Sequence, residues 1–130
     1  MDRIHNVVIA GNDYPLNFSV GVAAKVIEKY GDLSGINTAL GLTQQEEANN
    51  WVELCRNITW LLDLMLRAGA AYQRAVGQGA KLPPDMEALE VLLSPWEMME
   101  LRIPILEAIT AGMRTTIEVD PPKNAEATQN

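Results

Sequence analysis

Three carboxylates near the end of the chain have a spacing that could support metal chemistry. Glu97, Glu100 and Glu107 fall on one narrow stripe of a helix, where a pair of metal ions would need them. Di-metal sites in helix bundles also take a Glu-x-x-His motif from a neighbouring helix. The chain contains no such motif, so we expect no metal site.

The other residue types that carry catalysis stand alone. The chain has one histidine, His5, and one cysteine, Cys55, and neither lies in a zinc-binding or nucleophile motif. Gly77-Gln78-Gly79 lacks the preceding strand and the lysine of a phosphate-binding loop. We expect His5 on the surface and Cys55 in the core, in a protein that is not an enzyme and takes no cofactor.

Composition and charge limit the class of partner. The 130 residues are 48% hydrophobic and 21% charged, with a net charge of −7, which is ordinary for one globular domain. From Leu82 onward there are nine acidic and three basic residues. Such a stretch repels phosphate, so we expect no nucleic acid partner. The acidity fits either a solvated face or a docking surface for a basic partner.

The sequence also indicates a cytoplasmic location. The N-terminal residues lack the apolar segment of a signal peptide, and a lone Cys55 suits a reducing compartment. The most hydrophobic window, Ile58 to Leu66, contains Asp63 and is too short to span a bilayer. We expect no membrane contact.

The strongest pattern predicts one long amphipathic helix over residues 43–76. Thr43 and Glu46 form a capping box at its start, and Gly77 follows its end. Apolar residues recur on one stripe at spacings of three and four: Trp51, Leu54, Cys55, Ile58, Leu61, Leu62, Met65, Gly69, Tyr72 and Val76. The reverse side carries Trp60 and Leu64, so a second layer of the fold or a partner chain must cover it.

The residues before this helix predict a β-hairpin and a first helix. The strands are expected at Ile4 to Ala10 and Tyr14 to Phe18, around a Gly11-Asn12-Asp13 turn. Ser19 caps a helix over Val20 to Tyr30, and Gly31 ends it. The inner face of that helix is expected to hold Val22, Val26, Ile27 and Tyr30. A short element over Leu33 to Leu40 follows.

Two further helices are predicted after a proline break. One covers Met86 to Leu93, and the next begins at a capping box formed by Ser94 and Glu97. The last helix is expected to be kinked at Pro104, which removes a backbone hydrogen bond. It is apolar over most of its circumference, so it is central to the fold or lies in an assembly interface, and a homo-oligomer is possible.

These elements predict an α+β protein that is mostly α-helical. An N-terminal β-hairpin packs on a bundle of four to five helices, in a single globular domain over residues 1–119 with a disordered tail over residues 120–130. We expect Trp51 and Trp96 in the core. Trp60 is either covered by the kinked helix or part of a binding surface.

Three stretches of the chain carry a resemblance to a known family. They are Tyr14-Pro15-Leu16-Asn17-Phe18-Ser19, Ile27-Glu28-Lys29-Tyr30-Gly31-Asp32-Leu33, and Ile58-Thr59-Trp60-Leu61-Leu62 with the later Gly69. In these apolar patterns and turns the chain resembles the tail assembly chaperones of long-tailed, siphovirus-type bacteriophages and prophages. The resemblance extends from about Val7 to Met113.

The resemblance implies a non-enzymatic protein in the cytoplasm of the bacterial host. Such chaperones bind the tape-measure protein and tail-tube subunits during tail morphogenesis, and many also have a longer, frameshifted form. We expect the client surface to include Trp60, Leu64, Met98, Leu101 and Ile105. Two alternatives are a minor tail or head-tail completion protein that stays in the virion, and a small regulatory or antitoxin-type protein, which the acidic second half disfavours.

Overall fold

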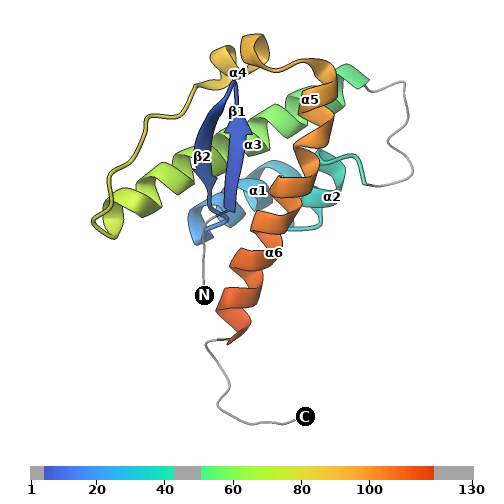
Figure 1. Cartoon of the computed structure of the whole chain (residues 1–130). Helices are drawn as coiled ribbons and strands as arrows, with labels where there is room; N and C mark the ends of the chain where they lie inside the picture. Colours follow the sequence, from blue (N-terminus) through green and yellow to red (C-terminus); the bar gives the residue numbers. More distant parts are fainter. Residues whose placement is uncertain (1–4, 43–50, 119–130) are drawn as a thin grey trace.

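The computed structural model describes residues 5–42 and 51–118, with side chains described up to Met113. The elements are β1 (His5–Ile9), β2 (Asn12–Leu16), α1 (Val20–Tyr30), α2 (Gly35–Ala39), α3 (Trp51–Ala75), α4 (Met86–Leu92), α5 (Pro95–Glu100) and α6 (Arg102–Glu118). The predicted α+β class is confirmed, with a two-stranded hairpin on a mostly helical body (Figure 1). The predicted capping box at Thr43 and the predicted tail over residues 120–130 lie outside the described residues.

The hairpin turns earlier than predicted. β1 and β2 pair antiparallel from His5 opposite Leu16 to Ile9 opposite Asn12. Ala10 and Gly11 form the turn, with φ values of 52° and 81°, because a two-residue turn with two positive φ angles matches the natural twist of paired strands. The second strand therefore starts at Asn12 rather than at Tyr14.

The end of the hairpin is fixed against the middle of α3. The backbone N–H of Asn17 donates to the carbonyl of Met65 at 3.2 Å. A Cβ atom added at Gly69 would lie 2.1 Å from the carbonyl oxygen of Pro15. Only a glycine allows the two backbones to approach this closely.

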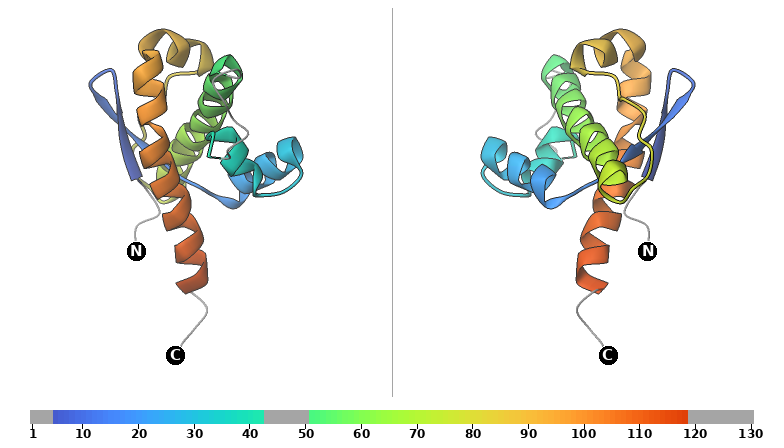
Figure 2. Two further views of the ribbon diagram at one scale, coloured as in Figure 1. Left: turned by 90° about the vertical axis from the view of Figure 1, so that its right-hand side faces the viewer. Right: turned by 90° about the vertical axis from the view of Figure 1, so that its left-hand side faces the viewer.

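The hydrophobic core surrounds α3 on more than one side. Figure 2 shows the hairpin on one side of α3 and the α1–α2 pair on the other. The long helix is therefore buried beyond its predicted stripe, since Leu66 is 1% exposed and the polar Asn57, Thr59 and Asp63 are also buried. Val76, predicted on the inner stripe, is half exposed.

Local signals in the sequence set the helix ends. Ser19 accepts from the N–H of Val22 at the start of α1, and Gly31 ends that helix with φ 99°. At the end of α3, the N–H groups of Gly77 and Gln78 donate to the carbonyls of Arg74 and Gln73, the pattern of a Schellman cap. Ser94 and Glu97 form the predicted capping box of α5.

The last helix bends at Leu101 rather than at Pro104. α5 ends at Glu100 and α6 starts at Arg102, so Pro104 lies in the first turn of α6. Pro104 has no N–H for the carbonyl of Glu100, one turn earlier, and its ring crowds that carbonyl. The chain therefore changes direction where the bond is missing, and the ladder resumes with Ile105 N–H donating to Leu101 at 3.1 Å.

Candidate partner-binding surface

The reverse side of α3 is covered by the fold itself. The Trp60 ring meets the Tyr30 ring edge to face, with centroids 6.0 Å apart and planes at 82°, and the Lys29 ammonium lies 5.1 Å from the Trp60 ring centre. Trp60 and Leu64 are both partly buried against the core. The covering helix is α1, and not the kinked helix that the sequence suggested.

The other three predicted contact residues are buried. Met98, Leu101 and Ile105 are only 5%, 8% and 0% exposed. The Thr59 hydroxyl lies 3.6 Å from the Met98 sulfur, which fixes α5 on α3. These three side chains therefore attach the bent helix to the core and are not exposed to a partner.

The opposite side of the bent helix instead carries an apolar groove of about 670 Å³. We call it the α5–α6 groove, and it is lined by Leu40, Leu42, Trp51, Pro95, Trp96, Met99, Glu100, Arg102, Ile103 and Leu106. Trp96 is 71% exposed and Ile103 is 66% exposed, while Trp51 and Leu106 are about 40% exposed. Two tryptophans that were predicted in the core thus lie on an open surface.

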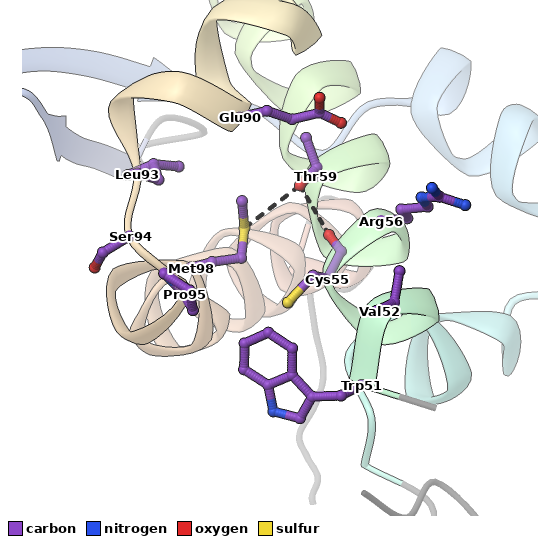
Figure 3. Close-up of a pocket in the computed structure, with 10 residues that line it drawn as sticks. All are labelled: Trp51, Val52, Cys55, Arg56, Thr59, Glu90, Leu93, Ser94, Pro95 and Met98. Carbon is purple, nitrogen blue, oxygen red and sulfur yellow. Dashed lines mark hydrogen bonds between the residues drawn. The ribbon is translucent and has the colours of Figure 1, made fainter. Parts of the chain in front are cut away.

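A smaller hollow of about 270 Å³ adjoins this groove and shares Trp51 and Pro95 with it. In Figure 3 the Trp51 ring and the Cys55 sulfur point from α3 toward the start of α5. Burial raises the pKa of the Cys55 thiol, so the protonated form is favoured at neutral pH. Cys55 thus acts as a small apolar side chain in the wall of the hollow.

Arg102 joins two parts of the groove lining by hydrogen bonds. Its Nε donates to the Met99 carbonyl at 3.0 Å, and its guanidinium also donates to the Leu40 carbonyl at 3.2 Å. The second bond links the bend between α5 and α6 to the end of α2. Because both partners are backbone groups of the lining, Arg102 maintains the spacing of the two groove walls.

Two carboxylates lie in the groove or next to it. Glu100 lies in its lining, and Glu107 lines an adjoining hollow that shares Ile103 and Leu106 with the groove. His5 of β1 lies 3.9 Å from the Glu107 carboxylate. Within the described part of the chain, no three His, Cys, Asp or Glu side chains gather as a metal site would require.

The groove offers a surface for apolar contact. Its residues are large, exposed and apolar, with charges at the margin, as in protein-binding surfaces. The wide apolar circumference of the last helix was the signal in the sequence that could have located it. Across residues 5–42 and 51–118, no helix is long and apolar enough to cross a membrane. Comparisons with models of protein families, with curated proteins and with solved structures found no match.

Proposed function

We propose that this protein is a non-enzymatic tail assembly chaperone of a long-tailed phage or prophage, acting in the host cytoplasm. Its α5–α6 groove holds apolar helical segments of the tape-measure protein before the tail tube is built around them. The observation that carries the proposal is the exposed apolar lining of the groove, in which Trp96 and Ile103 are the most exposed large side chains. The resemblance of residues 7–113 to such chaperones supports the same role.

The physical basis is the aggregation hazard of a long helical client. An amphipathic helix without its partner exposes an apolar stripe that associates with other copies. A groove that covers the stripe removes this hazard, and each large apolar side chain buried in it contributes about 1.5–3 kcal/mol. A few aromatic residues commonly provide most of such binding energy, and Trp96 is the most exposed large apolar side chain of the groove.

Co-expression with the tape-measure protein tests the proposal. The wild-type chain should keep the client soluble and co-purify with it, and the double variant Trp96→Ala/Ile103→Ala should lose at least about tenfold of the co-purified client, since two central contacts are removed. The control is Val20→Ala, which truncates an apolar side chain of α1 that is also mostly exposed. A client that stays insoluble with the wild-type chain contradicts the proposal.

A second readout separates this role from a structural one. A chaperone leaves the tail when assembly is complete, so the chain should be absent from purified particles and present in lysates of producing cells. Its recovery in purified particles at a fixed ratio to tail-tube subunits would instead identify a component of the virion.

A further inference from the structure

We propose that the α5–α6 groove selects a cationic amphipathic helix. The apolar stripe of that helix lies on Trp51, Trp96 and Ile103, and its Lys or Arg side chains face the carboxylates at the margin. This inference rests on the proposed function, because it concerns the same groove, and it adds the charge and shape of the bound segment.

The shape of the groove fits one helix of moderate length. Its lining runs along the outer side of α5 and the first half of α6, from Pro95 to Leu106, and the adjoining hollow extends it to Ala111. At a rise of 1.5 Å per residue this path is roughly 25 Å long, which matches a partner helix of about 16 residues. Apolar residues at spacings of three and four would present one continuous stripe to it.

Negative charge outweighs positive charge around the groove, although Arg56 lines the smaller adjoining hollow. Between Asp85 and Glu107 the chain has one basic residue, Arg102, whose guanidinium is already bonded to two backbone carbonyls. The acidic residues in this part are all exposed: Asp85, Glu87, Glu90, Glu97, Glu100 and Glu107. The negative potential of these carboxylates would raise the association rate of a cationic segment and would favour it over an anionic one.

Three of these carboxylates lie in the groove or on hollows next to it. Glu100 lines the groove itself. Glu97 lies beside Glu100 along a second hollow on the same helix, and Glu107 lies beside Ile103 and Leu106. Negative charge therefore lies within the apolar lining at Glu100 and beside its far end at Glu107, so a partner helix would gain from basic residues next to its apolar stripe.

The same charges disfavour the other occupants. A second copy of this chain would bring two rows of glutamates together, in a protein whose net charge is −7, and like charges across an interface are costly. Residues 43–50 contain no large apolar side chain, and residues 119–130 contain only Val119. Neither stretch can supply an apolar stripe, and residues 1–4 are too few to form one. A separate partner is therefore the better occupant, and the carboxylates favour a basic one.

Three labelled synthetic peptides test the inference with the full chain. Two share one apolar stripe and differ only in carrying Lys or Glu on the polar face, and the third has the composition of the Lys peptide in a scrambled order. Fluorescence anisotropy should show the Lys peptide binding at least about tenfold more tightly than the other two at low salt. Near 0.5 M salt the preference of the Lys over the Glu peptide should fall below about threefold, because the charges are screened. Equal binding of the Lys and Glu peptides, or of the Lys and scrambled peptides, overturns the inference.

A pair of charge variants locates the effect. Glu100→Gln/Glu107→Gln should weaken binding of the Lys peptide about fivefold, since two facing charges are lost. Asp13→Asn/Glu28→Gln makes the same change in net charge at exposed positions of β2 and α1 and should leave binding unchanged. Equal effects of the two double variants overturn the inference, as does a dimer of the free chain that Trp96→Ala dissociates.

The charge preference of the groove and the proposed chaperone role can fail independently of each other. If the tape-measure protein is held equally well by the wild-type chain and by Glu100→Gln/Glu107→Gln, the charge preference is refuted while the chaperone role stands. If the Lys peptide binds as expected but the client is not kept soluble, the groove has its preference and the chaperone role is refuted.

Discussion

Trp60 and Trp96 occupy two helical surfaces that look alike in sequence and differ in the folded protein. Trp60 lies on the reverse of α3, where the ring of Tyr30 and the ammonium of Lys29 cover it. Trp96 lies at the start of α5 and is 71% exposed. The first tryptophan therefore contributes to folding, and the second leaves its apolar area available for a partner.

The position of each helix explains the difference. α3 crosses the middle of the domain, with the hairpin on one side and α1 and α2 on the other (Figure 2). The bent α5–α6 unit packs on the core by residues such as Met98 and Ile105, and Arg102 links it to the end of α2. The apolar surface left over in this fold thus lies on the outer side of the bent helix.

The largest effect is expected where the covered region is most tightly packed. Gly69→Ala places a Cβ 2.1 Å from the Pro15 carbonyl, so the hairpin must move away from α3, and we expect a loss of about 3 kcal/mol in the free energy of unfolding. Urea denaturation measures it.

The control for this substitution is Gly21→Ala in α1, where the nearest atom to the added Cβ is the Ser19 hydroxyl oxygen at 3.7 Å. Alanine favours the helix there, so stability should be unchanged or slightly higher. Equal stabilities of the two variants would show that the hairpin does not pack closely on α3.

The next effect compares the two tryptophans directly. Trp60→Ala should lower the free energy of unfolding by about 2 kcal/mol, since a half-buried ring loses its contacts with α1. Trp96→Ala should change it by less than about 0.5 kcal/mol, because the ring is mostly in solvent already. Urea denaturation of both variants tests the comparison, and a reversed order would contradict it.

A smaller effect concerns the start of α5, which places Trp96. Ser94→Ala removes the hydroxyl that accepts from Glu97 N–H at 3.1 Å, and we expect a loss of about 1 kcal/mol in thermal or urea unfolding. Ser94→Asp keeps an acceptor at the N-cap and should restore most of the stability. If Ser94→Asp is no more stable than Ser94→Ala, the cap is not what stabilises α5.

The smallest effect is on the chemistry of Cys55 beside the groove. Burial raises the pKa of its thiol, so below that pKa the folded chain has a smaller thiolate fraction than a free thiol. Alkylation by iodoacetamide at pH 8 should be at least about threefold slower than in the urea-unfolded chain, and the difference should narrow as the pH rises. Equal rates at pH 8 would contradict the burial of this side chain.

Local signals made much of the fold predictable. Ser19, Gly31 and the Ser94–Glu97 capping box act within one turn of chain, so their residue types alone define the helix ends. The position of the hairpin turn was predicted wrongly because Ala10 has a left-handed backbone conformation, which alanine rarely adopts. The middle of the α3 stripe was predicted correctly, because its period of three and four residues is long and regular, whereas Trp51 and Val76 at its two ends are exposed.

The candidate site was harder to predict because periodicity shows which residues share a face and not what covers that face. Trp51 and Trp96 have the spacing of core residues, yet Trp51 is 40% exposed and Trp96 is 71% exposed. Conversely, Met98, Leu101 and Ile105 were predicted in the client surface and lie in the core. Tertiary packing decided both outcomes, through the arrangement of α1, α3 and the bent helix.

The most direct test of the account is a photo-crosslink from the groove to the client. Trp96→benzoylphenylalanine places a reactive aromatic group on the exposed side of α5, and Ala24→benzoylphenylalanine places the same group at an exposed position of α1. Each variant is irradiated together with the co-expressed tape-measure protein. The account predicts a crosslinked product from position 96 and none from position 24. Equal crosslinking from both positions, or crosslinking from position 24 alone, would contradict the assignment of the α5–α6 groove as the partner surface.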